Sequence, residues 1–269
     1  MNFSNILQAA TNYVWGGLRG YVTDQDAGYP YCRSGSGKRE ELERELLIYT
    51  KKELDKKSEV VVLPSGMTAI CCIIEIVLRR WEKNKSKKDR PHLVFGDELY
   101  CDTKNVLNYF HDIYSFTFEF INVRNKKGFE DIALNKGNKV ALLFLESCTN
   151  PSGQFCDFDD ILPSFKKKAP NCIVCIDNTW TSFCLFNPFE HHADVVVESL
   201  TKYGSGGTCI GGMIVGRGNL IKSIRRWSQI YGQFMTPYHC QLLIDGIKTI
   251  EERIKKGSEL TLKIGMQNR

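Results

Sequence analysis

From residue 59 onward, short apolar runs rich in valine and isoleucine alternate with longer amphipathic segments. Such runs are typical of buried β-strands, and apolar residues three or four positions apart are typical of helices. The pattern predicts strands at Val60–Leu63, His92–Phe95, Ser115–Ile121, Val140–Leu145, Cys172–Ile176, Asp194–Glu198 and Gly212–Val215. It predicts helices at Gly66–Lys83, Thr103–His111, Asp157–Lys168, Gly218–Tyr231 and Tyr238–Lys255. Because strands and helices alternate, we expect an α/β fold in which a mostly parallel, seven-stranded sheet lies between helices.

The two ends of the chain differ from this central region. Residues 1–58 are predicted to form an N-terminal arm that carries a helix at Arg39–Lys52, where charged residues four positions apart can pair. Residues 59–237 form the expected large domain. Residues 238–269 hold a connecting helix and then a polar tail, Gly257–Arg269.

Charge and hydropathy argue against several classes of protein. The net charge of +5 over 269 residues is mild, and no basic run is interleaved with aromatic residues, so no nucleic-acid partner is expected. The first residues do not show the basic and then apolar segments of a signal peptide. No apolar run approaches the roughly 18 residues of a membrane span. We therefore expect a cytoplasmic protein without a membrane partner.

The cysteines are numerous, eleven in all, and several lie inside apolar runs. Buried free cysteine behaves as a small hydrophobe, so these residues are interpreted as the core of a reduced protein. The Cys172-x-x-Cys175 pair also suggests a redox or zinc site. Alternation along a strand would place these two cysteines on opposite faces, and no second pair completes a metal set. No metal site is predicted.

Ionisable and turn-forming residues follow five of the predicted strands. In parallel sheets the ligand lies beyond the carboxyl ends of the strands, so these segments are expected to share one rim. They are Pro64–Met67, Gly96–Tyr100, Glu146–Pro151, Asp177–Thr179 and Ser199–Lys202. A structural protein needs turns there, but it does not need an Asp, a Lys, a Tyr and an Asn converging on one place. The sequence predicts one ligand site at this rim.

Lys202 is the first candidate for chemistry at that site. A lysine after a strand is, by itself, more often a solvated loop residue. Here Ser199 and Thr201 precede it with hydroxyl groups suited to a phosphate, and a glycine-rich segment follows, which lets the backbone approach a ligand. An amine in a partly desolvated site near cations is less basic, and therefore nucleophilic enough to form a Schiff base.

Three further positions each allow a functional and a structural interpretation. Asp177 ends a buried strand, where a carboxylate is costly unless it is paired, for example with a protonated pyridine nitrogen; alternatively, it caps the following turn. Ser65-Gly66-Met67 opens a helix whose free amides make an anion site, or Ser65 is a plain helix cap. Tyr100 either presents its ring face to a flat cofactor or is an ordinary core or surface tyrosine.

Together these segments resemble the fold-type-I pyridoxal-phosphate (PLP) enzymes of cysteine and methionine metabolism. That family includes the cystathionine γ-synthases, the cystathionine lyases and the O-acylhomoserine sulfhydrylases. The resemblance runs from about Tyr29 to Arg253. The motifs that carry it, in the family's order, are YPYCRSGSGKREELE, LPSGMTAI, GDELYCDT, LESCTNPSG, IDNTW and ADVVVESLTKYGSGG. Any one match is weak, and six in order are strong, so the expected fold is the large domain of a fold-type-I PLP-dependent transferase.

The resemblance implies pyridoxal 5'-phosphate as the cofactor and a role for each matching residue. Lys202 would form the Schiff base and shuttle protons between substrate carbons. Asp177 would pair with the pyridine nitrogen, and Tyr100 would stack on the ring. Asn150 would lie near the cofactor oxygen and the substrate carboxylate.

The resemblance also implies a phosphate site and a neighbouring subunit. The residues implied around the phosphate are Ser65, Gly66, Met67, Ser199 and Thr201. Tyr31 and Arg33 would reach the phosphate in a neighbouring subunit, which makes a homodimer or a homotetramer the implied assembly.

The chain departs from the family's pattern in places. Cys148 replaces a proline, and Cys101-Asp102 replaces a small pair that usually contains glycine, which adds a negative charge near the site. The family continues into a smaller C-terminal domain, whose arginine binds the substrate carboxylate. Residues 238–269 would correspond to the connecting helix and a truncated start of that domain.

Two functions follow from the resemblance. The first is an enzyme of sulfur amino-acid metabolism, which would take a small amino-acid substrate through β- or γ-elimination or γ-replacement, with Lys202 and Tyr100 as catalytic residues. Its substrate would be cystathionine, cysteine, methionine or an O-acylhomoserine. The alternative is a PLP-binding but catalytically weakened paralogue that acts as a partner or regulatory subunit of a full-length homologue. A truncated form of a longer product is a third possibility that the sequence leaves open.

Overall fold

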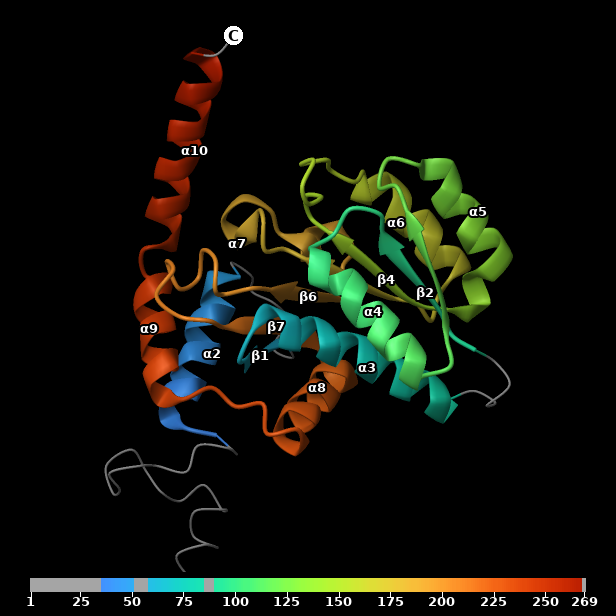
Figure 1. The fold of residues 1–269 in the computed structure, drawn as a ribbon, viewed down its shortest axis with the longest axis horizontal. Coiled ribbons are helices and arrows are strands. Elements are labelled where there is room, and N and C mark those ends of the chain that lie inside the picture. The colour runs from blue at the N-terminus through green and yellow to red at the C-terminus, as the bar shows by residue number, and fades with distance from the viewer. Residues whose placement is uncertain (1–34, 51–57, 85–89, 268–269) are drawn as a thin grey trace, which may run out of the picture.

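The computed structural model describes residues 35–50, 58–84 and 90–267, and its centre is a seven-stranded sheet (Figure 1). The strands are β1 (Ser58–Leu63), β2 (His92–Gly96), β3 (Thr117–Ile121), β4 (Val140–Glu146), β5 (Ile173–Asp177), β6 (Val195–Glu198) and β7 (Gly212–Arg217). Their order in the sheet is β1-β7-β6-β5-β4-β2-β3. Neighbours pair in parallel except β7, which is antiparallel to both β1 and β6. The prediction of a mostly parallel sheet of seven strands is confirmed.

Helices cover both faces of the sheet (Figure 1). On one face lie α3 (Gly66–Asn84), α4 (Cys101–Ile113) and α8 (Gly218–Ile230). The opposite face is covered by α5 (Lys126–Lys136) and α6 (Phe158–Lys168) over one half of the sheet and by α2 (Gly37–Tyr49) and α9 (Pro237–Ile247) over the other. Shorter elements are α7 (Ser182–Leu185) and the 3-10 helices η1 (Gly137–Lys139) and η2 (Pro188–His191). The sheet therefore lies between two helical layers, as the alternation of apolar runs predicts.

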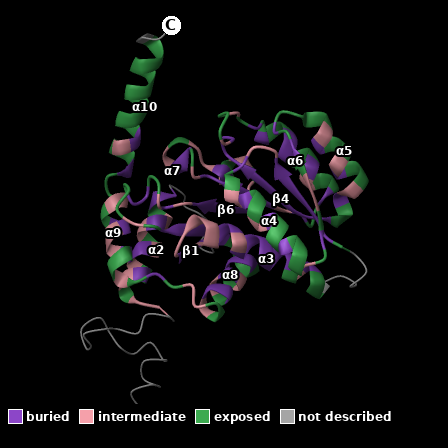
Figure 2. Ribbon diagram, in the orientation of Figure 1, coloured by how far each residue is buried: buried purple, intermediate pink, exposed green. Residues whose placement is uncertain are grey.

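Alternation along the strands divides the core into these two layers. In β1, Val61 and Leu63 join the cluster under α3 and α8, whereas Val60 and Val62 join the cluster under α2 and α9. Figure 2 shows the inner strands buried and the outer sides of the helices exposed, and the edge strand β3 is largely exposed or half-buried. Because successive residues of a strand face opposite sides of the sheet, this alternation also determines which helical layer each side chain at the carboxyl end of the strand faces.

The C-terminal helices correct one prediction. The predicted helix Tyr238–Lys255 is two helices, α9 and α10 (Ile250–Gln267), separated by a turn at Lys248 and Thr249. The break follows Gly246, whose backbone lies so close to the loop after β6 that an added Cβ would be 2.3 Å from the carbonyl oxygen of Gly204. The Thr249 amide then bonds to the Gly246 carbonyl at 3.2 Å, which closes a turn in place of a continuous helix.

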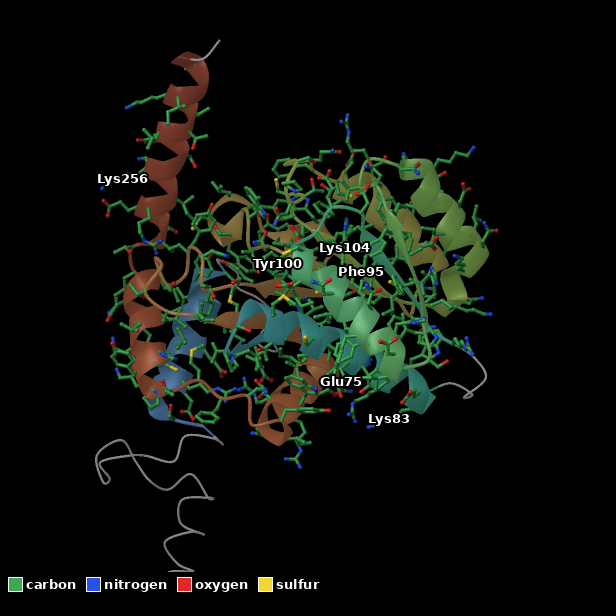
Figure 3. All side chains as sticks on the ribbon, viewed as in Figure 1. Glu75, Lys83, Phe95, Tyr100, Lys104 and Lys256 are labelled. Carbon is green, nitrogen blue, oxygen red and sulfur yellow. The ribbon has the colours of Figure 1, made fainter. Side chains whose placement is uncertain are left out.

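The expected polar tail is also helical. Helix α10 extends away from the sheet to Gln267, and its outer part is exposed (Figures 1 and 2). Lys256, on this outer part, forms an ion pair with Glu252 one turn earlier, with Nζ and Oε1 2.7 Å apart (Figure 3). Pairs at this spacing support an exposed helix. Polarity alone is therefore not a sign of irregular structure here.

Candidate active site

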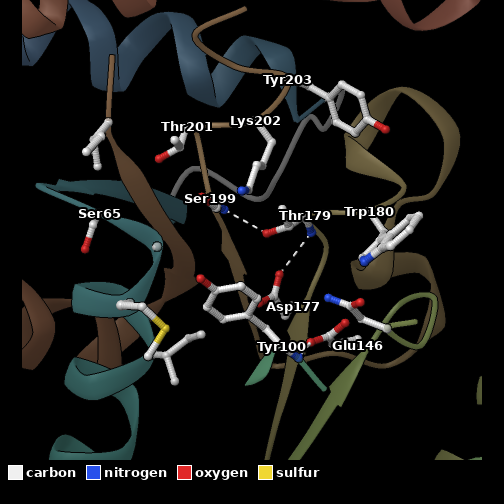
Figure 4. Close-up of a pocket in the computed structure, with 15 residues that line it drawn as sticks. Ser65, Tyr100, Glu146, Asp177, Thr179, Trp180, Ser199, Thr201, Lys202 and Tyr203 are labelled. Atoms are coloured by element: carbon white, nitrogen blue, oxygen red, sulfur yellow. Dashed lines mark hydrogen bonds between the residues drawn. The ribbon is translucent and has the colours of Figure 1, made fainter. Parts of the chain in front are cut away.

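A cavity of about 600 Å³ opens at the carboxyl ends of β4, β5 and β6, beside the N-terminus of α3 (Figure 4). Its volume lies within the ~300–1,000 Å³ typical of small-molecule sites. Nine residues predicted from the sequence line it: Ser65, Gly66, Met67, Tyr100, Asn150, Asp177, Ser199, Thr201 and Lys202. Six further residues that were not predicted also line it: Ile70, Glu146, Thr179, Trp180, Tyr203 and Ile210. The predicted Tyr31 and Arg33 lie outside the described residues.

Lys202 reaches the cavity from the loop between β6 and β7. Its backbone amide bonds to the Ser199 carbonyl at 3.3 Å, and its side chain is directed into the cavity (Figure 4). The residue is exposed, because the cavity is open on this side. An accessible primary amine is therefore available to a molecule bound in the cavity.

Asp177 is a buried carboxyl group at the end of β5. Burial raises the pKa of Asp177, and hydrogen bonds from Thr179 act in the opposite direction. The Thr179 amide donates to Asp177 Oδ1 at 3.0 Å, and Thr179 Oγ1 in turn accepts from the Ser199 amide at 2.8 Å (Figure 4). This chain of bonds ties the end of β5 to the loop that carries Lys202. The carboxyl group and the amine thus line one cavity on the same side of the sheet.

The N-terminus of α3 forms the anion-binding end of the cavity. Ser65 caps the helix, because its Oγ accepts from the Thr68 amide at 3.0 Å. The amides of Gly66 and Met67 have no acceptor among the described residues. Free amides at a helix N-terminus attract an anion such as a phosphate. Ser65 therefore caps α3, and the amides of Gly66 and Met67 remain available to bind an anion.

Thr201 closes the loop beside this end of the cavity. Its Oγ1 donates to the Gly211 carbonyl at 3.2 Å and accepts from the Gly211 amide at 3.1 Å. The hydroxyl proton is therefore already used within the loop. By contrast, the hydroxyl of Ser199 has no hydrogen-bond partner among the described residues, so it is the freer donor of the two.

Tyr100 lies at the start of α4 and forms part of the cavity wall (Figures 3 and 4). Its side chain is 37% exposed. Asp102 and Cys101 raise the pKa of the Tyr100 phenol, so it keeps its proton at neutral pH. The backbone amide of Tyr100 donates to Oε1 of Glu146 at 2.6 Å. The position of Tyr100 thus depends on a residue at the end of β4.

Glu146 is the most consequential residue that the sequence interpretation missed. It ends the apolar run of β4 just as Asp177 ends that of β5, and the two are Cα partners across these strands. A carboxyl group at a buried strand end is costly unless it is paired, and Glu146 shares this signal with Asp177. The sequence places Glu146 in the rim segment Glu146–Pro151, and its position at the end of an apolar run marks it as a candidate site residue.

Asn150 and Trp180 complete the mouth of the cavity. Asn150 lies in the loop after β4, where Thr149 Oγ1 accepts from the Gln154 amide at 2.9 Å and so shapes the turn. Trp180 is 45% exposed and follows Thr179 directly. A large aromatic side chain at the mouth can cover part of a bound molecule.

Within the described ranges, no group of three or more His, Cys, Asp or Glu side chains is arranged to hold a metal ion. Cys172 and Cys175 belong to core clusters on opposite faces of the sheet. None of the helices in the described part of the chain is both long and apolar enough to cross a membrane.

The residues present fit pyridoxal phosphate. An amine that can reach an aldehyde, a buried carboxyl group that needs a cationic partner, and free amides that suit a phosphate all face one cavity. The backbone at Gly66 also lies against Ser199, at a distance that no larger residue allows. These features lie at separate parts of the wall, as a cofactor with an aldehyde, a ring nitrogen and a phosphate requires.

Comparison with known proteins supports this conclusion. A family model described as Cys/Met metabolism PLP-dependent enzyme matches residues 2–266. The chain is 31% identical over 238 residues to a cystathionine beta-lyase of Schizosaccharomyces pombe, a match that covers 88% of this chain and 56% of that protein. It is 28% identical over 236 residues to an L-methionine gamma-lyase of Treponema denticola, covering 86% and 54%.

The fold agrees with the sequence match. The crystal structure of cystathionine gamma synthase from Xanthomonas oryzae pv. oryzae in complex with cystathionine aligns with a TM-score of 0.71 at 24% identity, covering 85% of this chain and 55% of that one. The chain thus spans about half the length of the relatives it matches. Because the family model matches nearly the whole chain and the fold is that of the fold-type-I enzymes, this chain belongs to the family of Cys/Met metabolism PLP-dependent enzymes.

Proposed function

We propose that this chain binds pyridoxal phosphate in the cavity and acts on amino acids that carry sulfur or an acyloxy group. The observation that carries the proposal is the shared cavity of Lys202, Asp177 and the open N-terminus of α3. These three features supply an amine, a carboxylate and an anion site. Each of the three features would contact a different part of the cofactor. A structural role, such as a helix cap or a turn, could explain one of them but not all three together.

Eight of the lining residues have a proposed task in holding the cofactor. Lys202 binds its aldehyde, and Asp177 pairs with the pyridine nitrogen. Tyr100 covers one face of the ring. The phosphate is held by the amides of Gly66 and Met67 with the hydroxyl of Ser199, while Thr201 supports the loop and Asn150 lies near the ring oxygen.

Pyridoxal phosphate, when bound, supplies an aldehyde for imine formation and a ring that withdraws electrons from the substrate's Cα. Asp177 would keep a proton on the ring nitrogen, because a nearby carboxylate favours the charged form of a base. The Lys202 Nζ, once it is free, takes a proton from the substrate Cα and delivers it to a neighbouring carbon. Trp180 at the mouth limits the access of water.

The relatives support a reaction class for this proposal. They include a cystathionine beta-lyase and a methionine gamma-lyase, and one structural neighbour is a cystathionine gamma synthase. We therefore infer β- or γ-elimination or γ-replacement on cystathionine, cysteine, methionine or an O-acylhomoserine. Tyr31 and Arg33 are proposed to complete the phosphate site of a neighbouring subunit, in a homodimer or homotetramer.

The test uses the purified chain loaded with pyridoxal phosphate. Cystathionine, cysteine, methionine, or O-acetylhomoserine with sulfide is added, and the visible spectrum and the release of an oxo acid or a new thioether are followed. The proposal expects a spectral change and product with at least one of these substrates, and neither with a Lys202→Ala chain. A loaded chain whose spectrum no amino acid perturbs would contradict the enzymatic function.

The charge of the cavity favours a second candidate function. Among the described lining residues, Lys202 is the one Lys or Arg side chain, and the cofactor is proposed to occupy it. A substrate carboxylate finds little attraction from these side chains. This favours a cofactor-binding chain that acts as a partner or regulatory subunit of a full-length homologue. That function predicts activity only in mixtures with such a homologue, measured against each protein alone.

A further inference from the structure

Glu146 is a buried carboxyl group whose two oxygens differ. The residue is 4% exposed and lines the cavity. Oε1 accepts from the backbone amide of Tyr100 at 2.6 Å. Oε2 is buried and has no hydrogen-bond partner among the described residues. A buried polar atom without a partner is costly, so this oxygen calls for an explanation.

The neighbouring strand places a second carboxyl group beside it. Glu146 and Asp177 are Cα partners in β4 and β5, and paired residues of adjacent strands lie only about 5 Å apart and face the same side. Two carboxylates this close inside a protein do not both ionise readily. Burial, followed by the charge of Asp177, raises the pKa of Glu146 to about 8. One proton is therefore retained between the two groups at neutral pH.

The proton belongs on Glu146 rather than on Asp177. The Thr179 amide donates to Asp177 Oδ1 at 3.0 Å, and Thr179 lowers the pKa of Asp177 against the effect of burial. For Glu146 the Tyr100 amide acts in the same direction, but burial and the charge of Asp177 outweigh it. Among the described residues, the other titratable groups that line the cavity are Tyr100, Lys202 and Tyr203. Cys148 lies two residues after Glu146, and burial, followed by the charge of Glu146, raises the pKa of its thiol.

We propose that Glu146 is a positioning residue of this site: Oε1 fixes the backbone of Tyr100, and Oε2, carrying the proton, leaves Asp177 as the ionised member of the pair. The inference rests on the proposed function in one respect, namely that Tyr100 and Asp177 hold pyridoxal phosphate. Glu146 acts through these two residues. It converts a cavity with two acids into one with a single negative charge opposite the ring nitrogen.

The chain offers a closely matched control in Glu198. It ends β6, is 1% exposed, and its pKa is also raised to about 8. Its Oε1 accepts from the Tyr49 hydroxyl at 3.0 Å, and its Oε2 has no partner among the described residues. Glu198 does not line the cavity. A change there removes an equally buried acid that has no contact with Tyr100.

The first experiment measures the affinity for pyridoxal phosphate by absorbance titration of four variants. Glu146→Gln keeps an acceptor for the Tyr100 amide and an N–H in place of the O–H, so its Kd should stay within about threefold of that of the unmodified chain. Glu146→Ala loses the contact with the Tyr100 amide and the carboxyl proton, and its Kd should rise about 10- to 100-fold. Glu198→Gln and Glu198→Ala should bind as the unmodified chain does. Circular dichroism identifies any variant that has not folded.

The second experiment observes the proton directly and needs no cofactor. Infrared difference spectra of the unmodified chain minus Glu146→Gln, taken near neutral pH, should show the C=O stretching band of a protonated carboxyl group. The band should vanish as the pH is raised through about 8. A merely structural role for an ionised Glu146 would give no such band.

The outcomes separate this inference from the proposed function. If the unmodified chain does not bind pyridoxal phosphate, the proposed function fails, while the infrared band still decides whether Glu146 holds the proton. If the unmodified chain binds but Glu146→Ala binds equally well, Glu146 does not position Tyr100. If the difference spectrum shows only a carboxylate, the assignment of the proton is wrong.

Discussion

Gly66 and Ser199 lie so close together that a side chain at Gly66 would overlap Ser199. An added Cβ would be 2.7 Å from Ser199 Cβ, 3.0 Å from its Oγ and 3.1 Å from its Cα. This approach brings the first turn of α3 against the loop that follows β6. It places the free amides of α3 and the free hydroxyl of Ser199 at the same end of the cavity, where the phosphate is proposed to bind.

Replacing Gly66 by alanine should therefore damage the site. Backbone atoms must shift to admit the methyl group, so Gly66→Ala should lower the free energy of unfolding by about 1–3 kcal/mol. It should also weaken the binding of pyridoxal phosphate by about tenfold or more, through the displaced amides. Gly257→Ala is the matched control, because nothing lies within 4 Å of a Cβ at that position. Equal effects of the two changes on affinity would refute this account of the phosphate site.

Thr201 should matter for stability more than for the direct contact with a phosphate. Its hydroxyl bonds to both the amide and the carbonyl of the buried Gly211. Thr201→Val removes these bonds and leaves the Gly211 amide without its partner, which should cost about 1–2 kcal/mol in urea unfolding. Thr201→Ser keeps the hydroxyl and should lose less. If serine is as harmful as valine, the methyl group rather than the hydroxyl holds the loop.

Glu198 predicts a pH dependence of stability. Burial raises its pKa to about 8 in the folded chain, far above the ordinary value near 4.5 that applies once it is unfolded. The folded state therefore holds a proton that the unfolded state releases, so this contribution is fully present below about pH 4.5 and is lost as the pH rises toward 8. Glu198→Gln cannot ionise. Urea unfolding at several pH values in this window should show a flatter dependence for the variant, and identical slopes would exclude a protonated Glu198.

Glu75 should contribute strongly to stability on the face of the sheet that α3, α4 and α8 cover. Its Oε1 accepts from Tyr231 at 2.6 Å, from Arg79 at 2.7 Å and from Tyr114 at 3.0 Å, and its Oε2 accepts from Trp227 at 2.9 Å. These donors join α3 to α8 and to the end of α4. Figure 3 marks the place of Glu75 on α3.

Glu75→Ala leaves these donors without their shared acceptor, and the buried indole N–H of Trp227 finds no other. We expect a loss of about 2–4 kcal/mol in the free energy of unfolding. Glu82→Ala, an exposed change on the same helix, should cost about 0.5 kcal/mol or less. Comparable losses for the two variants would show that the hydrogen bonds to Glu75 add nothing to the free energy of unfolding.

Most of the strands could be predicted because they are buried apolar runs whose ends carry turn residues; β3, at the edge of the sheet, is largely exposed or half-buried. Helix α5, by contrast, was not predicted. Its sequence, KKGFEDIALNK, holds a single i, i+3, i+4 set of apolar residues, Phe129, Ile132 and Ala133, and begins with two lysines and a glycine, so the helical pattern is short. Its position is set by packing against α6, where Phe129 meets Phe165 with ring centroids 6.1 Å apart. That contact joins residues far apart in the chain, and periodicity does not record it.

The sequence could predict which residues form most of the candidate site, but not the hydrogen bonds that those residues make. The rule that ligands bind at the carboxyl ends of parallel strands brought Asp177, Lys202 and the start of α3 to one rim. The same rule does not say which hydroxyl is free. Thr201 and Ser199 look equivalent in sequence, and only the fold shows that Thr201 is engaged with Gly211.

The central claim is that the Lys202 amine binds the aldehyde of pyridoxal phosphate. Borohydride reduces the C=N bond between a lysine and this cofactor to a stable amine, so the purified chain can be loaded, reduced, digested and mapped by mass spectrometry. The account predicts the cofactor on the peptide that contains Lys202, and no label at the proposed site in Lys202→Ala. Labelling of another lysine alone, or no labelling of the unmodified chain, would contradict it.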